Sequence, residues 1–91
     1  LAALTDRGLT RVLCEGGPHL LADLLAADLL DELCVTTTPV LVGPGPGRIV
    51  AGMPPLVAGA ATGPASADPR RPRLEHLLHA GGTLAARWAL R

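Results

Sequence analysis

The residues of this chain that are best suited to chemistry lie in one short stretch, where Glu15 is followed by Gly16, Gly17 and Pro18. An apolar run precedes the glutamate, and a leucine-rich helical pattern follows the proline. This order predicts a buried strand that delivers a tight turn to a helix N-terminus. Free backbone N–H groups and the positive end of the helix dipole meet at such a turn, which suits a phosphate. The same pattern also fits a strand–turn–helix connection that binds no ligand.

We name residues 16–18 the Gly-Gly-Pro turn, which consists of Gly16, Gly17 and Pro18. Physical reasons explain why glycine and proline suit these positions. Glycine adopts positive φ angles and lets a ligand approach the main chain without meeting a Cβ atom. Proline fits the first helical turn, where its missing N–H costs nothing. His19 follows in that turn, where it would either touch a bound phosphate or serve as a polar residue at the helix start.

Glu15 is the polar residue best suited to a chemical role. A carboxylate at the C-terminal end of a buried strand lies where open α/β sheets place their ligands. Its oxygens would accept a hydrogen bond from a substrate N–H or O–H, or they would accept from backbone donors in the turn. The sequence leaves both roles open.

Other groupings of chemically active residues are weaker. The three histidines are dispersed and have no carboxylate or thiolate partners at ligand spacing, which predicts no metal site: His19, His76 and His79. Asp31 and Glu32 are adjacent, so on a regular element their side chains point apart, and paired acid–base chemistry is not favoured.

The composition argues against nucleic-acid and membrane partners. The 91 residues include eight arginines, no lysine and eight carboxylates, so the net charge is near zero. This balance gives no electrostatic reason to bind nucleic acid or an anionic membrane. Trp88 alone is available for base stacking. No apolar stretch approaches the ~20 uninterrupted residues that a membrane-spanning helix needs.

The two cysteines indicate a reducing environment. Cys14 and Cys34 are too few for a disulfide framework, and nothing in the sequence resembles a secretory signal. Each lies in an apolar, strand-like run, where a free cysteine usually behaves as a small buried hydrophobe. We therefore expect buried, reduced thiols in a cytoplasmic protein.

The elements that must position the Gly-Gly-Pro turn follow from the hydrophobic periodicity. Residues 1–7 are typical of the end of an amphipathic helix, with Gly8 after it. Residues 9–14 predict a strand buried on both faces, as in a parallel sheet. A stripe of leucines predicts a helix over residues 18–27. This alternation of helices and strands is typical of an α/β layer fold.

The second half begins with a β-branched strand over residues 33–38, which Pro39 makes an edge strand or a bulged one. Residues 43–48 form a predicted turn cluster, in which Arg48 is a solvated charge or an anion contact. Residues 51–71 predict a long loop of the functional or mobile kind.

The chain ends in a pattern that predicts a β-hairpin, with strands over residues 73–78 and 83–89 and a turn over residues 80–82. Trp88 lies in the second of these strands, where we expect it to pack on the core or on an interface.

Residues 14–48, CEGGPHLLADLLAADLLDELCVTTTPVLVGPGPGR, carry a series of motifs that resembles a known family. Glu-Gly-Gly-Pro follows a predicted strand, a leucine-rich helix comes next, Leu-Asp-Glu-Leu enters a second strand, and Pro39 with Gly43 closes it. The hairpin, with its Gly-Gly turn and an aromatic residue in the last strand, also matches. In this order the chain resembles the C-terminal half of the pyrimidine reductase domain of riboflavin biosynthesis.

The resemblance implies an α/β, dihydrofolate-reductase-like three-layer sandwich, of which residues 1–91 would be only the C-terminal portion. It implies an oxidoreductase that uses NADPH to reduce the ribosylamino-pyrimidine 5′-phosphate, with hydride passing to the sugar carbon as the ring opens to a ribityl chain. The cofactor carries the hydride, and the protein positions the two partners and excludes water.

The site residues carried over by the resemblance lie in two places. The Gly-Gly-Pro turn would hold the NADPH phosphates, with His19 and Leu20 beside it. Glu15 would face the substrate or the nicotinamide end as the catalytic candidate, and Gly43 would shape the loop near the site. The prolines around Gly45 depart from the family's glycine cluster.

The resemblance also implies what surrounds the chain. The family's N-terminal half is absent from this sequence, so we expect an incomplete sheet with exposed edges, a piece that is inactive alone, and a homodimer acting on a small-molecule substrate. Two alternatives stay open. One is a related reductase for a pterin-like or carbonyl substrate. The other is a non-catalytic α/β module that oligomerises through its sheet edge and Trp88.

Overall fold

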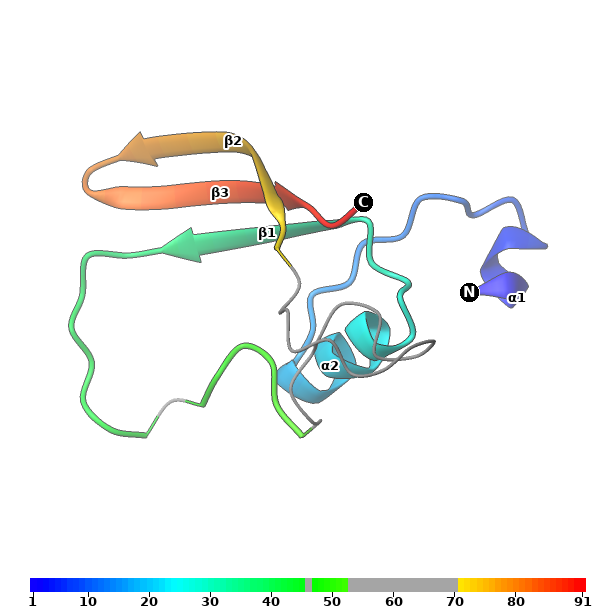
Figure 1. Ribbon diagram of the computed structural model, residues 1–91, viewed down its shortest axis with the longest axis horizontal. Coiled ribbons are helices and arrows are strands. Elements are labelled where there is room, and N and C mark those ends of the chain that lie inside the picture. Colours follow the sequence, from blue (N-terminus) through cyan, green and yellow to red (C-terminus); the bar gives the residue numbers. More distant parts are fainter. Residues whose placement is uncertain (46, 53–70) are drawn as a thin grey trace.

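The computed structural model describes residues 1–45, 47–52 and 71–91. Two short helices are followed by three strands, and the strands form one antiparallel sheet in the order β1-β3-β2 (Figure 1). The α/β composition that the sequence predicts is confirmed. The prediction of a parallel sheet is wrong for the described strands. Most of the loop predicted over residues 51–71 lies outside the described residues.

The first helix, α1 (Ala2–Thr5), ends two residues before the predicted boundary at Arg7, and the predicted role of Gly8 at the end of the helix is confirmed. Gly8 has a φ of +77° and donates its N–H to the carbonyl of Thr5 at 2.8 Å, while Leu9 donates to the carbonyl of Leu4 at 3.0 Å. This pair of bonds is the Schellman motif, which satisfies the last carbonyls of a helix and favours glycine at this position.

The second helix, α2 (Pro18–Ala26), confirms the leucine-stripe prediction. Gly17 occupies the N-cap position, and Pro18 begins the first turn. A second Schellman motif ends the helix, with Asp28 at a φ of +54°. Ala22 and Leu25 are the buried residues of the described ranges, with 0% and 5% of their surface exposed.

Residues 9–17 form no strand, which corrects the prediction of a buried strand over residues 9–14. Leu13 is 84% exposed, and Cys14 and Cys34 are both exposed, so the prediction of buried thiols is also wrong. The physical reason is the lack of a neighbour. A strand exists only where an adjacent strand accepts its backbone hydrogen bonds, and no described strand pairs with this segment.

The sheet is built around β3 (Thr83–Ala89), which pairs with β1 (Glu32–Thr37) on one side and with β2 (Arg73–Ala80) on the other. The structure therefore confirms the strand before Pro39 as an edge strand and confirms the terminal hairpin. Gly81 and Gly82 have φ angles of +57° and +81°. Positive φ at both central residues is what a two-residue type I′ hairpin turn requires.

A β-bulge between Leu74 and His76 divides the side chains of the sheet into two unlike faces. At this point β2 has one residue more than β3. Glu75 therefore has no partner on β3, and His76 lies on the same face as Arg87. The opposite face is almost entirely apolar, and we name it the apolar face. Its apolar residues are Leu33, Val35, Leu74, Leu77, Leu84, Ala86 and Trp88, and its polar residues are Thr37 and His79.

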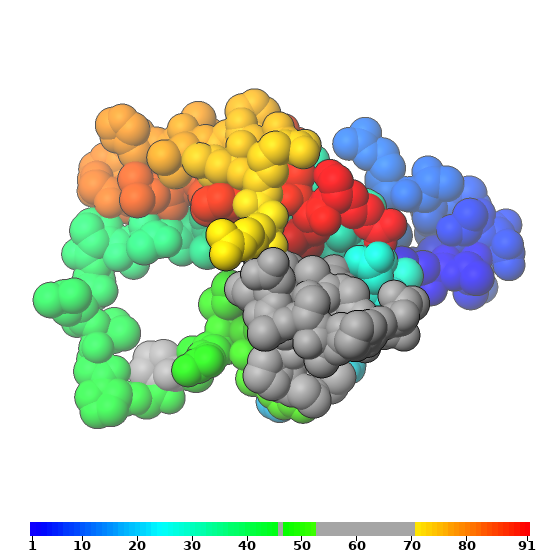
Figure 2. Space-filling view, viewed as in Figure 1, coloured from blue at the N-terminus to red at the C-terminus, as the bar shows by residue number. Residues whose placement is uncertain are grey.

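Neither described helix packs directly on the strands. The chain after β1 arches away from the sheet and leaves open space inside the arch (Figure 2), and Val40, Leu41 and Val42 on this arch are exposed. The described elements thus establish an α/β chain with a small sheet, and they do not by themselves form three layers. None of the helices in the described ranges has the length and apolar character needed to cross a membrane.

We expect the replacement Gly81→Val to destabilise the protein, because a left-handed conformation costs a residue with a Cβ atom about 1–2 kcal/mol. Urea unfolding of the two proteins measures this difference. Gly43→Val is the control, since Gly43 has no positive φ and open space around it. Equal losses in the two variants would contradict the assignment of the hairpin turn.

Candidate functional site

A groove of about 1070 Å³ lies between the segment before α2 and the free edge of β1. The side of β1 that does not pair with β3 faces this groove, so the groove follows the edge of the sheet. Its walls are residues 10–18, Leu21, residues 29–36 and Ile49. Glu15 and all of the Gly-Gly-Pro turn therefore share one wall.

The Gly-Gly-Pro turn has the form that a phosphate cradle needs. Gly16 has a φ of +82°, and a Cβ atom on either Gly16 or Gly17 would meet nothing within 4 Å. The N–H groups of His19 and Leu20 donate to no described residue. Exposed amides at a helix N-terminus beside open space fit a phosphate group.

Glu15 differs from the two other acids on the groove wall. Asp31 pairs with Nε of Arg91 at 3.2 Å, and Glu32 pairs with the Arg87 guanidinium at 2.9 Å. Glu15 is exposed and makes no ion pair with any residue in the described ranges. Among these three carboxylates, Glu15 is the one available to a ligand.

His19 and Leu20 do not line the groove. The His19 ring lies against Gly52, and a Cβ atom on Gly52 would overlap it. Leu20 is largely exposed on α2. Their side chains therefore do not share the groove wall with Glu15, and their proposed cofactor contacts stay predictions.

Two parts of the groove were not predicted from the sequence: the edge of β1 and Ile49. Which segments face each other across a groove depends on packing between residues far apart in the chain, and local periodicity does not carry that information. One signal was present: the turn cluster after β1 follows the C-terminal end of a strand, where α/β sheets place ligands.

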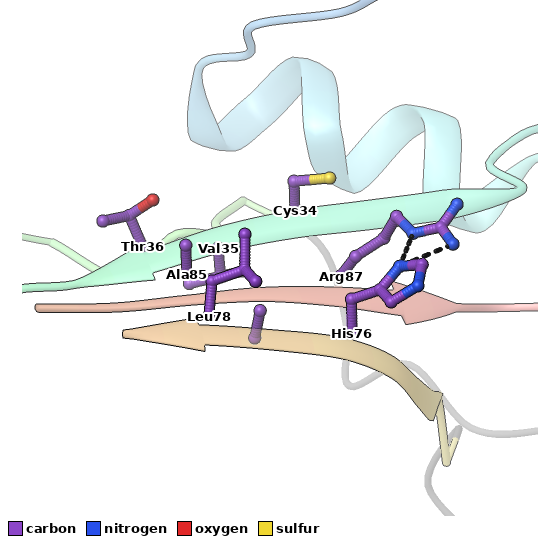
Figure 3. A pocket seen from close by; sticks show the side chains of 8 residues that line it. Cys34, Val35, Thr36, His76, Leu78, Ala85 and Arg87 are labelled. Atoms are coloured by element: carbon purple, nitrogen blue, oxygen red, sulfur yellow. Dashed lines mark hydrogen bonds between the residues drawn. The ribbon is translucent and has the colours of Figure 1, made fainter. Parts of the chain in front are cut away.

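A second, shallow pocket of about 450 Å³ lies at the face of the sheet that carries His76 and Arg87 (Figure 3). Arg87 dominates it, donating from Nε to Nδ1 of His76 at 3.1 Å and from its NH1 atom to Glu32 at 2.9 Å. These groups satisfy one another and tie the three strands together, so they do not converge on a ligand. No group of three His, Cys, Asp or Glu side chains in the described ranges is placed to hold a metal ion.

The fold and the groove define an α/β protein with a glycine turn at the N-terminus of a helix, next to an unpaired carboxylate. Residues 1–86 match the family model described as RibD C-terminal domain. The chain belongs to this family, the C-terminal part of the pyrimidine reductases of riboflavin biosynthesis. No curated protein matches the chain.

Arg73 perturbs one carboxyl group, that of Glu75 at the bulge on β2. Arg73 donates from Nε and from its NH2 atom to the same Glu75 oxygen, at 2.8 and 2.5 Å. This hydrogen bond and the charge of Arg73 lower the pKa of Glu75. A lowered pKa in the folded state contributes stability above the unfolded pKa, and that contribution is lost as the pH falls through the folded pKa.

We therefore expect Arg73→Gln to raise the pKa of Glu75 toward its ordinary value, as measured by an NMR titration of the side-chain carboxyl carbon. Arg71→Gln is the matched control, because Arg71 is exposed and does not contribute to the pKa of Glu75. The same Glu75 pKa in wild type and Arg73→Gln would show that the ion pair does not form in solution.

Proposed function

We propose that this chain is part of an enzyme that reduces the ribosylamino-pyrimidine 5′-phosphate of riboflavin biosynthesis to its ribitylamino form with NADPH. Membership of the family supports the general class of the enzyme, a reductase. The observation that carries the cofactor assignment is the Gly-Gly-Pro turn, with open space where two Cβ atoms would lie and free amides at the start of α2. That combination accepts an anionic phosphate.

The roles of the residues follow from where they lie. When bound, NADPH supplies the hydride. The amides of His19 and Leu20 would hold its phosphates at the positive end of α2. Glu15 would accept a hydrogen bond from a substrate N–H or O–H and so orient the sugar carbon. We infer that the surrounding fold is the C-terminal portion of a dihydrofolate-reductase-like sandwich, a reading supported by the unpaired edge of β1 along the groove.

The replacement Gly17→Val tests this assignment, because a β-branched side chain would occupy the space that a phosphate needs. In the protein expressed from its complete gene, we expect the variant to bind NADPH at least about tenfold more weakly. A fluorescence titration with NADPH measures this change, and a turnover assay on the ribosylamino-pyrimidine tests the substrate.

Ala80→Val, at the exposed tip of the hairpin, is the control for adding a β-branched residue. Equal binding by wild type and Gly17→Val would overturn the role of the turn. A wild-type protein that binds no NADPH would leave the non-catalytic oligomerisation module as the better account. Binding without turnover of the ribosylamino-pyrimidine would favour a related reductase with another substrate.

We also propose that the protein is a homodimer whose subunits meet on the apolar face of the sheet. Leu74, Leu77 and Leu84 on this face are exposed, although they adjoin the half-buried Trp88. A contiguous apolar surface of this kind is typical of an interaction site. The hydrophobic gain from covering it would favour association.

The neighbouring residues Leu77 and Leu78 provide a matched pair of tests. Both are exposed, at 53% and 69%, but they lie on opposite faces of β2. We expect Leu77→Glu to convert the dimer to a monomer in size-exclusion chromatography with light scattering, and Leu78→Glu to leave it a dimer. Dissociation by both variants, or by neither, would argue against this interface.

A further inference from the structure

The charged side chains among the described residues that line the groove are mostly acidic. They are one arginine and three carboxylates: Arg11, Glu15, Asp31 and Glu32. All four residues are exposed. Taken alone, they would make the groove negative, and a negative groove repels an anion. The cofactor and the pyrimidine phosphate of the proposed function are both anions, so the lining residues by themselves oppose their binding.

Two arginines that do not line the groove remove this conflict. Nε of Arg91 lies 3.2 Å from a carboxylate oxygen of Asp31, and the NH1 atom of Arg87 lies 2.9 Å from a carboxylate oxygen of Glu32. Neither arginine belongs to the groove walls. Each one cancels the charge of an acid that does belong to them, so the paired acids no longer give the groove an excess of negative charge.

The fold holds both arginines beside their acids. Arg87 is a β3 residue whose Nε also donates to Nδ1 of His76 at 3.1 Å. The backbone next to Arg91 is tied as well, because Leu90 donates its N–H to the carbonyl of Asp31 at 2.9 Å. A side chain that is already restrained loses less conformational entropy when it forms an ion pair, which favours the paired state.

We propose that Arg91 and Arg87 determine the charge specificity of the groove, because they neutralise the two acids at the start of β1 and so admit an anionic ligand. This inference rests on the proposed function for the statement that the ligand is an anion. It assigns a role in ligand selection to two arginines that lie outside the groove walls and act through Asp31 and Glu32.

The replacement Arg91→Gln tests the inference in the protein expressed from its complete gene. Glutamine keeps N–H donors but loses the charge, so Asp31 becomes an unpaired negative charge on the groove wall. We expect NADPH to bind about threefold more weakly and the double variant Asp31→Asn/Arg91→Gln to recover the wild-type affinity. The loss should shrink at about 1 M salt, where the Debye length is about 3 Å.

A double variant that binds as weakly as Arg91→Gln would overturn the inference, because the loss would then come from a structural tether and not from charge. Arg73→Gln is the matched control. It also leaves an acid, Glu75, without its ion pair, but neither residue lines the groove. We expect Arg73→Gln to bind NADPH like wild type, and an equal loss in Arg73→Gln and Arg91→Gln would contradict the inference.

The same cycle with Arg87→Gln and Glu32→Gln/Arg87→Gln tests the second pair. Circular dichroism accompanies it, because Arg87 also joins the strands of the sheet through His76. We expect weaker binding of NADPH in the single variant and recovery in the double variant. No recovery in a double variant that keeps the wild-type spectrum would overturn the role of Arg87.

A thiol reagent measures the charge of the groove without any cofactor, because Cys14 is a free, exposed thiol on the groove wall. Dithiobis(nitrobenzoate) is a dianion, and dithiodipyridine is neutral. Mass spectrometry of the Cys14 peptide gives the rate of its reaction with each reagent. The ratio of the two rates cancels changes in exposure of the thiol. We expect this ratio to fall about threefold in Arg91→Gln and to recover in Asp31→Asn/Arg91→Gln.

This measurement separates the inference from the proposed function. The expected fall of the ratio, in a protein whose wild type binds no NADPH, would overturn the cofactor assignment and support the role of Arg91. The same ratio in wild type and Arg91→Gln, in a protein that does bind NADPH, would overturn the inference and leave the proposed function in place.

Discussion

The central strand β3 must be hydrogen-bonded along both edges, and the arrangement of the other elements depends on this ladder. Its partners are far apart in the sequence: β1 follows α2, whereas β2 directly precedes β3. Beyond β3 the chain continues the contact, because Leu90 donates to the carbonyl of Asp31 at 2.9 Å and Arg91 binds both Asp31 and the carbonyl of Asp28. These bonds hold the connection from α2 to β1, and so they fix the edge of β1 that forms one wall of the groove.

The parts of this fold that the sequence predicts are those with local causes. The leucine stripe and Pro18 specify α2, and two glycines with positive φ specify the hairpin turn. The errors concern burial. The apolar run around Val12, Leu13 and Cys14 shows that the segment can be buried, but burial depends on a neighbour, and no described strand pairs with it. The bulge at Glu75 was not predicted either. Glu75 and His76 both stand between Leu74 and Leu77, and the extra residue is what places these two leucines on the same face.

In the candidate site, too, the residues with local causes were predicted and those that depend on distant contacts were not. Glu15 and the Gly-Gly-Pro turn are contiguous in sequence, so their presence on one wall of the groove follows from local geometry alone. The opposite wall, made by β1 and Ile49, needs a non-local contact that no periodicity encodes. Gly52 is the instructive case. In the sequence it is one glycine among eleven, and only the position of the His19 ring shows why a side chain there would be excluded.

The distribution of charge separates structural groups from groups available to ligands. The pairs Arg73–Glu75, Arg87–Glu32 and Arg91–Asp31 all involve the sheet or its ends. Such exposed pairs add little stability, so their main effect is to neutralise the charges that they join. Glu15 and Arg48 have no such partner among the described residues. An unpaired charge in contact with water costs the free protein little, because water solvates it, and its full hydrogen-bonding capacity stays available. A hydrogen-bond donor on a ligand at the Gly-Gly-Pro turn would therefore meet Glu15 without first breaking an ion pair, whereas a ligand at Arg87 would have to displace Glu32.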